Sequence, residues 1–321
     1  MPSTSHRSGR AGAETVRDLT DVPSFPAVYA AALAPRPGTH RSDELPDLAY
    51  RVRRVRIDPA KAAAFDHLMG GPATEFAHPG VLHTLGFPVM LALMARPSFP
   101  TSLLGLVHLE NQFLQHAPVR VGSLVDVECR VRSLRPHRKG RTFEAVATFL
   151  DQDGTIVATD VSTYLARSKG SSESSGGTSR TPSRASAFEP PVPTGRWKLG
   201  ADTGRRYAAV SGDANPIHLS GLTARAFGFR SAIAHGMYTA SRALSEARAD
   251  LRRPLRWDVT FEAPVTLPGT ILVSYADDDG SGGEGLRSTR CVGWKPASAG
   301  RDGGEGRPAR RCFEVAVTEL A

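Results

Sequence analysis

The sequence predicts an α+β protein built from two copies of one unit, in which a long apolar helix is wrapped by a curved antiparallel sheet. Three observations lead to this fold class. A Ser/Gly/Pro-rich segment, residues 167–193, divides the chain of 321 residues into two parts. Both parts contain the same order of expected elements. Their strands alternate apolar and polar residues, which is typical of an antiparallel sheet with one buried face, and each apolar helix needs such a face to cover it.

The first copy is expected to contain a strand, a short helical stretch, the apolar helix "LHTLGFPVMLALM" and four strands, at residues 50–58, 60–69, 82–94, 106–113, 123–134, 141–151 and 155–167. The second copy repeats this order at residues 195–202, 203–212, 233–247, 255–261, 270–276, 286–295 and 312–320. A period of roughly 140–150 residues is much longer than a solenoid repeat, so each copy should be a domain-like unit.

Four segments follow along the chain. We expect a disordered tail at residues 1–20, a first unit at 21–166, a flexible linker at 167–193 and a second unit at 194–321. The linker prediction rests on composition, because such a polar Ser/Gly/Pro run cannot pack into a core. Two Gly-rich stretches between the last strands, around 277–287 and 297–311, are expected to be disordered loops.

Composition and cysteine usage indicate a soluble cytoplasmic protein. Hydrophobic residues make up 40% and charged residues 22% of the chain, which are ordinary globular values. Cys129, Cys291 and Cys312 are an odd number without C-x-x-C spacing, which argues against disulfides and structural zinc. The longest apolar run, 87–95, is about half the length that crosses a bilayer, and the N-terminus lacks the apolar core of a signal peptide. We therefore expect no membrane association.

The net charge of +8 leaves several partners open. The densest basic run, "RPHRKGR" at residues 135–141, lies between two expected strands and has no interleaved aromatic residues for base stacking. A solvated hairpin loop is the simplest interpretation. Contact with the phosphates of a nucleotide-like ligand or with an acidic carrier protein is the second, and nucleic acid, which we do not expect as a partner, is the third.

The segment "SGDANPIH", residues 211–218, brings a carboxylate and an imidazole close together in the chain. Because proline disfavours helix in the preceding residue but suits the first helical position, Asn215 is expected as N-cap and Pro216 as first residue of a helix. Asp213 then lies in the entering loop and His218 in the first turn, so both side chains can converge on one water. The alternative is a capped helix start with a surface histidine.

The sequence "YAAVSGDANPIHLSGLTARAFGF" followed by "AIAHGMYTASRAL" resembles the hydratase signature of MaoC-like dehydratases and (R)-specific enoyl-CoA hydratases. That family has the hotdog fold, so the resemblance implies a double hotdog for the whole chain. The aspartate and histidine of the signature are the catalytic pair of the family, which implies that Asp213 and His218 are catalytic here.

An oxyanion site is expected where the second apolar helix begins. Free N–H groups at a helix start suit a developing negative oxygen, and a glycine lets a ligand approach the backbone, so Gly236 is the candidate donor. Asn215 and Met237 are further substrate-binding candidates. His235 is more typical of a structural residue in front of a buried helix. We expect no metal site, since the spacing of His67, His78 and His83 places them on no common helical face.

Sliding the second copy onto the first by 142 residues places Gly71 opposite Asp213 and Phe76 opposite His218. The first unit is therefore expected to be non-catalytic and to accommodate the acyl chain. Phe87, Met90 and Leu91 lie on or near its helix, and we expect medium or longer chains to be better substrates than crotonyl-CoA. Met90 is equally compatible with an ordinary core position.

The sequence and the resemblance together predict a hydro-lyase that hydrates trans-2-enoyl-CoA to (R)-3-hydroxyacyl-CoA, or catalyses the reverse dehydration, without a cofactor. One alternative is a 3-hydroxyacyl-thioester dehydratase whose substrate is carried by an acyl carrier protein in fatty-acid or polyketide synthesis. Another is a non-catalytic acyl-thioester-binding protein. Acyl-CoA is the expected partner, and a homodimer is left open.

Overall fold

A computed structural model describes residues 15–33, 42–103, 105–167, 188–278, 287–298 and 306–321. The first half contains β1 (Thr15–Leu19), α1 (Phe25–Leu33), β2 (Leu48–Arg56), α2 (Pro59–Met69), α3 (Pro79–Met94), β3 (Val107–Gln115), β4 (Leu124–His137), β5 (Gly140–Leu150) and β6 (Ile156–Arg167). The second half contains β7 (Gly195–Leu199), α4 (Thr203–Ser211), α5 (Pro216–Leu219), α6 (Gly221–Ala226), α7 (Gly236–Ala247), β8 (Leu255–Phe261), β9 (Gly269–Asp278), β10 (Ser288–Lys295) and β11 (Arg310–Glu319). The predicted order of elements is confirmed in both halves.

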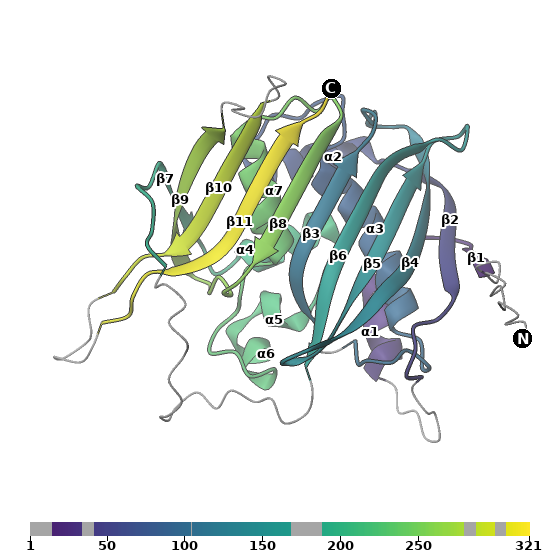
Figure 1. Cartoon of the computed structure of the whole chain (residues 1–321), viewed down its shortest axis with the longest axis horizontal. Helices are drawn as coiled ribbons and strands as arrows, with labels where there is room; N and C mark the ends of the chain where they lie inside the picture. The colour runs from purple at the N-terminus through teal and green to yellow at the C-terminus, as the bar shows by residue number, and fades with distance from the viewer. Residues whose placement is uncertain (1–14, 34–41, 104, 168–187, 279–286, 299–305) are drawn as a thin grey trace, which may run out of the picture.

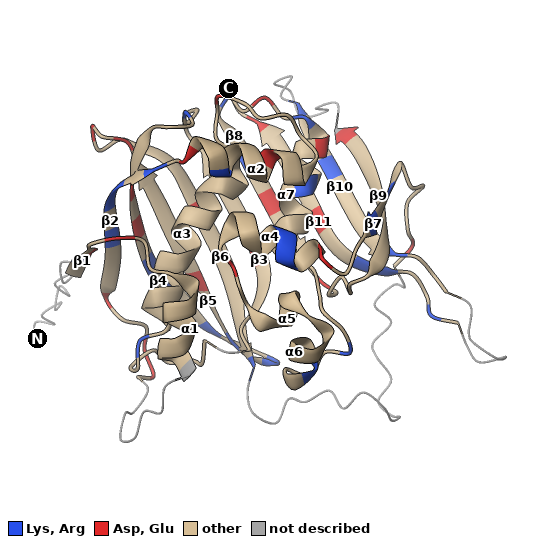
Figure 2. Cartoon of the chain, turned by 180° about the vertical axis from the view of Figure 1, so that it is seen from behind, with Lys and Arg blue, Asp and Glu red and all other residues tan. Residues whose placement is uncertain are grey.

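The strands form one continuous sheet in the order β1-β2-β4-β5-β6-β3-β8-β11-β10-β9-β7. The two halves join where β3 pairs antiparallel with β8, from Glu110 opposite Thr260 to Gln115 opposite Leu255. The main helices lie on one face of this curved sheet, as Figures 1 and 2 show from opposite sides. α3 packs on β2, β4 and β5, and α7 packs on β8, β10 and β11.

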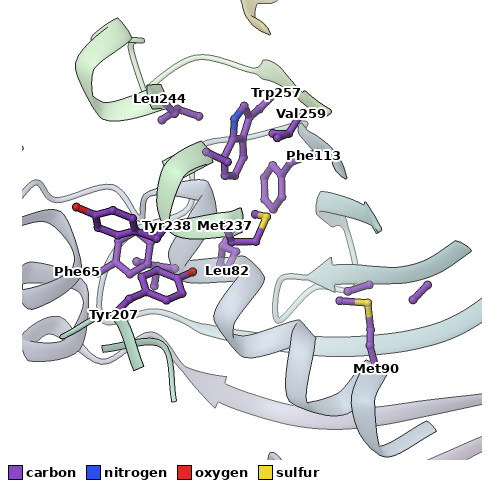
Figure 3. Packing of buried hydrophobic residues seen from close by; sticks show 14 of the residues in the cluster. Phe65, Leu82, Met90, Phe113, Tyr207, Met237, Tyr238, Leu244, Trp257 and Val259 are labelled. Carbon is purple, nitrogen blue, oxygen red and sulfur yellow. The ribbon is translucent and has the colours of Figure 1, made fainter. Parts of the chain in front are cut away.

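Buried hydrophobic residues of both halves form one continuous core. Phe113 of β3 and Trp257 of β8 are fully buried, and their ring centroids lie 6.3 Å apart across the join between the halves. Phe65 of α2 and Tyr207 of α4 meet in the same way, with centroids 6.1 Å apart (Figure 3). Burying one large apolar side chain stabilises the fold by about 1.5–3 kcal/mol, so the join is a substantial part of the core.

The helices α2 and α4 are equivalent elements of the two halves. α2 begins at Pro59 behind the N-cap Asp58, whose carboxylate accepts the N–H groups of Ala60 and Lys61. Both helices end at a glycine in the left-handed region, Gly70 with φ 85° and Gly212 with φ 78°, where a side chain would be strained. The alignment of the two halves by 142 residues is therefore correct up to this point.

Beyond the two glycines, the alignment by 142 residues is wrong. Phe76 forms an isolated bridge with Arg120, and the matching bridge of the second half joins Ile233 to Thr266, so Phe76 corresponds to Ile233 and not to His218. The second half is longer between these points, and the additional residues form α5 and α6. The described part of the first half has no counterpart of α5, the helix that carries His218.

Two segment boundaries also differ from expectation. Residues Thr15–Leu19, inside the expected disordered tail, form β1 and pair parallel with β2 from Leu48 to Val52. Backbone hydrogen bonds to β2 order this segment although its side chains are exposed, apart from the half-buried Leu19. Most of the expected linker, 168–187, and the centres of both expected loops, 279–286 and 299–305, lie outside the described residues. No helix within the described ranges has the length and apolar character needed to span a membrane.

Candidate active site

The turn between α4 and α5 is fixed by a chain of local hydrogen bonds. The Ser211 hydroxyl accepts the N–H of Asp213 at 3.1 Å, and Asp213 Oδ1 accepts the N–H of Asn215 at 3.1 Å. Asn215 is the N-cap of α5, as predicted, and its Oδ1 accepts the N–H of Ile217 at 3.4 Å. Each side chain thus satisfies a backbone donor two residues further on, which makes the turn rigid.

His218 presents one free ring nitrogen to the site. Its Nδ1–H donates to the carbonyl oxygen of Ile233 at 2.8 Å, which fixes the tautomer and leaves Nε2 with its lone pair. The side chain is buried, and burial lowers the pKa of His218 to about 3. The neighbouring His235 acts in the same direction and Asp213 in the opposite one. His218 is therefore neutral near pH 7 and can accept a proton.

His235 lies directly against the predicted pair. It is the N-cap residue of α7, and its Nε2–H donates to the backbone carbonyl of Asp213 at 3.0 Å and lies 3.7 Å from Asp213 Oδ2. Its ring stacks on His218 with centroids 3.7 Å apart. Burial lowers the pKa of His235 to about 3, so it too is neutral near pH 7. His235 positions the backbone and the ring of the two candidate catalytic residues.

Burial changes Asp213 in the opposite sense from the histidines. Desolvation raises the pKa of Asp213, and this effect is opposed by His218, by the N–H of Asn215 and by His83. Such a carboxyl group holds a proton to a higher pH than an exposed aspartate. Burial thus shifts the pKa values of Asp213 and His218 in opposite directions within one site, which is typical of an acid and a base that act together.

Gly236 is the first residue of α7, at the position where N–H groups have no partner within the helix. A Cβ atom at Gly236 would lie 2.9–3.1 Å from ring carbons of Phe261, so packing against this ring also requires a glycine. Met237 is buried in the hydrophobic core and lies beside Leu82 in Figure 3. The substrate-binding roles of Gly236, Met237 and Asn215 stay predictions.

The first half contributes polar residues near Asp213 that the sequence analysis did not identify. The phenols of Tyr29 on α1 and Tyr164 on β6 both interact electrostatically with Asp213. His83 on α3 also interacts with Asp213, and its Nδ1–H donates to the buried carboxylate of Asp160 at 2.7 Å. Asn111 Nδ2 donates to the other oxygen of Asp160 at 2.9 Å. These contacts join helices and strands that lie far apart in sequence, so no local pattern could reveal them.

Among the described residues, Asp213, His218 and His235 form the group whose donor atoms have metal-ligand spacing, all within 4.8 Å of one another. His67, His78 and His83 do not form such a group within these ranges. The geometry of the two rings does not suit a shared ion, because a metal bonds to imidazole nitrogen in the ring plane at about 2.0–2.1 Å. In stacked rings the lone pairs run side by side and do not converge on one point.

Comparisons with known proteins identify relatives of this chain. Residues 178–288 match the model of the MaoC like domain. The 3-hydroxyacyl-thioester dehydratase X of Mycobacterium tuberculosis is 34% identical over 265 residues, which cover 82% of this chain and 92% of that protein. The crystal structure of HtdX from M. tuberculosis superposes with a TM-score of 0.66 at 28% identity, covering 85% of this chain and 100% of that one.

A further structure supports the fold alone. A conserved hypothetical protein of M. tuberculosis described as having a double hotdog fold matches with a TM-score of 0.51 at 15% identity, covering 83% of this chain and 93% of that one. The fold, the matched domain and the similarity along most of the chain agree with one another. The chain therefore belongs to the MaoC-like dehydratase family.

Proposed function

We propose that the protein, a hydro-lyase of acyl thioesters, hydrates trans-2-enoyl-CoA to (R)-3-hydroxyacyl-CoA and catalyses the reverse dehydration with Asp213 and His218 as acid and base. The observation that carries this proposal is the convergence of Asp213 and His218 in one buried site, with their donor atoms within 4.8 Å of each other. Burial there raises the pKa of Asp213 and lowers that of His218 to about 3. A non-catalytic thioester-binding protein would not require such a pair.

In the hydration direction, His218 Nε2 takes a proton from water as the water oxygen forms its bond to carbon 3. The double-bond electrons move toward the thioester carbonyl, and the carboxyl group of Asp213 gives its proton to carbon 2. The site is then left with an imidazolium beside a carboxylate. Transfer of one proton from His218 to Asp213 restores the starting state, so atoms and charge balance. Dehydration runs through the same steps in reverse.

Negative charge on the thioester oxygen needs donors during this reaction. The N–H of Gly236 at the start of α7 is the proposed donor, because the helix dipole adds to its positive end. The close contact of Gly236 with Phe261 leaves little freedom for the backbone at this point. A fixed donor requires little reorganisation as the charge develops.

The first half is proposed to accommodate the acyl chain. Phe87 supports this role, since its ring lies 5.5 Å from those of Phe25 and His83, which are both close to the catalytic turn. Met90 and Leu91 are buried in the core, so Met90 has the ordinary core position considered above. The preference for medium or longer chains stays a prediction.

An acyl carrier protein in place of CoA is the second candidate. The basic run 135–141 forms the hairpin between β4 and β5, where Arg135 and Arg138 are exposed and available to an acidic surface. Activity on a carrier-bound substrate that falls steeply with salt, while activity on the CoA thioester falls little, would favour this candidate.

The test of the proposed function is hydration of crotonyl-CoA and longer 2-enoyl-CoA homologues, followed through loss of absorbance of the enoyl-thioester band. Chiral analysis of the product should give the (R)-3-hydroxyacyl thioester. We expect turnover by the purified protein, with a higher kcat/KM for the longer chains. Tight binding of the thioesters without turnover would support the non-catalytic alternative, and the (S) product would contradict the proposal.

A further inference from the structure

The helix α1, near the start of the first half, packs against the turn that carries the catalytic pair. Its first residue, Phe25, is buried and lies so close to Gly212 that a Cβ atom there would be 3.3 Å from the ring. The same ring lies 5.5 Å from Phe87 of α3, and Figure 2 shows α1 beside α3. Phe25 thus anchors α1 between α3 and the end of α4.

Tyr29 follows Phe25 by one helical turn and lies on the same face of α1. Its phenol lies close enough to the side chain of Asn215 for a hydrogen-bonding interaction that acts to lower the pKa of Tyr29. Because this interaction favours the phenolate form, Asn215 Nδ2 is the donor and the phenol oxygen is the acceptor. The hydroxyl hydrogen of Tyr29 remains available as a donor on the side of the site.

Asp213 on the turn and Tyr164 on β6 interact electrostatically with this phenol. Burial, followed by these two neighbours, raises the pKa of Tyr29 far above its usual value. The phenol is therefore neutral at every working pH and stays able to donate and to accept. A permanently neutral group beside Asn215 holds that amide without adding a charge to the site.

We propose that Tyr29 is a positioning residue of the hydratase site, which holds the Asn215 amide and thereby the turn from Asp213 to His218. The inference rests on the proposed function for its kinetic consequences. Asn215 is the link, since its backbone N–H binds Asp213 Oδ1 and its side chain caps the helix of His218. The half of the chain without the catalytic motif thus completes the geometry of the catalytic half.

The first test is Tyr29→Phe, which removes the hydroxyl and keeps the ring. We expect kcat to fall about tenfold with KM within about twofold, because a misplaced acid and base slow the chemical step more than they weaken binding. Tyr50→Phe is the matched control. Its phenol also has a hydrogen bond, from Arg96 at 2.8 Å, but lies on β2, and kcat should not change. An unchanged kcat in Tyr29→Phe would overturn the proposal.

A double-mutant cycle shows whether Tyr29 acts through Asn215. Asn215→Ala should lower kcat at least as much as Tyr29→Phe, and the double variant should be no slower than Asn215→Ala alone. If the two losses multiply, Tyr29 acts independently of Asn215, and the proposed route is wrong.

Amide hydrogen exchange of the ligand-free protein provides a readout that needs no activity. In Tyr29→Phe, the amides of residues 213–218 should exchange faster than in the wild type, while Tyr50→Phe leaves them unchanged. This result would support Tyr29 as a positioning residue even if the wild type hydrated none of the enoyl thioesters. Unchanged exchange of these amides in Tyr29→Phe would refute it whatever the substrate.

Discussion

Burial changes the pKa values of Asp213 and His218 in opposite directions, and this is the chemical basis of the roles proposed for them. Removal from water disfavours the charged form of any group, so the carboxyl tends to keep its proton and the imidazole tends to remain without one. The hydrogen bond from His218 Nδ1–H to Ile233 then fixes which nitrogen carries the lone pair. In the proposed mechanism the environment of each group sets its role, since Asp213 and His218 lie only five positions apart in the same short segment.

At the residue scale, we expect Asp213→Asn and His218→Gln each to lower kcat by at least about 10²-fold, the usual scale for loss of a positioned acid or base. Both substitutions keep the approximate shape of the side chain, so far-ultraviolet circular dichroism should be unchanged. The measurement is steady-state hydration of the best enoyl-CoA found for the wild type.

Gly71→Ala is the control in the first half. A Cβ atom at Gly71 would be in ordinary contact, 3.7 Å from the Asp66 carbonyl oxygen, so the variant should fold and keep its activity. Activity within a few-fold of wild type in either Asp213→Asn or His218→Gln would contradict the assignment. Loss of activity in Gly71→Ala would mean that the first half has a direct part in the chemistry.

At the scale of single elements, the start of α7 depends on the contact between Gly236 and Phe261. We expect Gly236→Ala to lower the free energy of unfolding by about 1–3 kcal/mol, because the added methyl group overpacks against the Phe261 ring. Phe261→Leu in the same chain should recover part of that loss. Urea denaturation of the wild type and these two variants measures the effect.

Gly221→Ala is the matched control, since Gly221 is also the first residue of a helix, α6, and a Cβ atom there would come no closer than 4.0 Å to Ala232. Its free energy of unfolding should change little. Equal losses in Gly221→Ala and Gly236→Ala would show that the contact with Phe261 is not the cause.

Elements whose ends are determined by neighbouring residues could be predicted from the sequence. The other elements and contacts depend on segments that lie far apart in the chain. The turn at Asn215 and Pro216 follows from capping chemistry within a few residues. By contrast, β1 is a short polar strand ordered by β2, and Tyr29 meets Asn215 across most of the chain. The alignment of Phe76 with His218 was wrong because the helices α5 and α6 exist in one half only, a length difference that a fixed offset cannot represent.

At the scale of the whole molecule, four buried histidines make stability depend on pH. The pKa of His78 is lowered to about 4 and those of His108, His218 and His235 to about 3, in each case mainly by burial. In the unfolded chain these groups take up protons as the pH falls through about 6.5. Between about pH 4 and pH 6.5 the unfolded state therefore binds more protons than the folded state, so the free energy of unfolding decreases as the pH falls.

Two buried carboxyl groups act in the opposite direction. Burial raises the pKa of Asp66 to about 6 and also raises that of Asp213, so the folded state keeps these protons longer than the unfolded state. Because the four histidines outnumber the two carboxyl groups, the free energy of unfolding should decrease near pH 5 by on the order of 2–3 kcal/mol for each unit by which the pH falls.

Urea unfolding at a series of pH values from 7 to 5 measures this dependence. His78→Gln should make it less steep, while His116→Gln, at an exposed position, should leave it unchanged. Constant or rising stability over this range would contradict the prediction.

The pairing of β3 with β8 also bears on how the enzyme behaves on dilution. Because both partners belong to one polypeptide, each strand meets the other at a fixed effective concentration, on the order of millimolar for short flexible connections, however dilute the enzyme is. An assembly of two separate hotdog chains would lose this contact at low concentration. The specific activity of the single chain should therefore be independent of enzyme concentration, and only one of the two halves has to retain the catalytic motif.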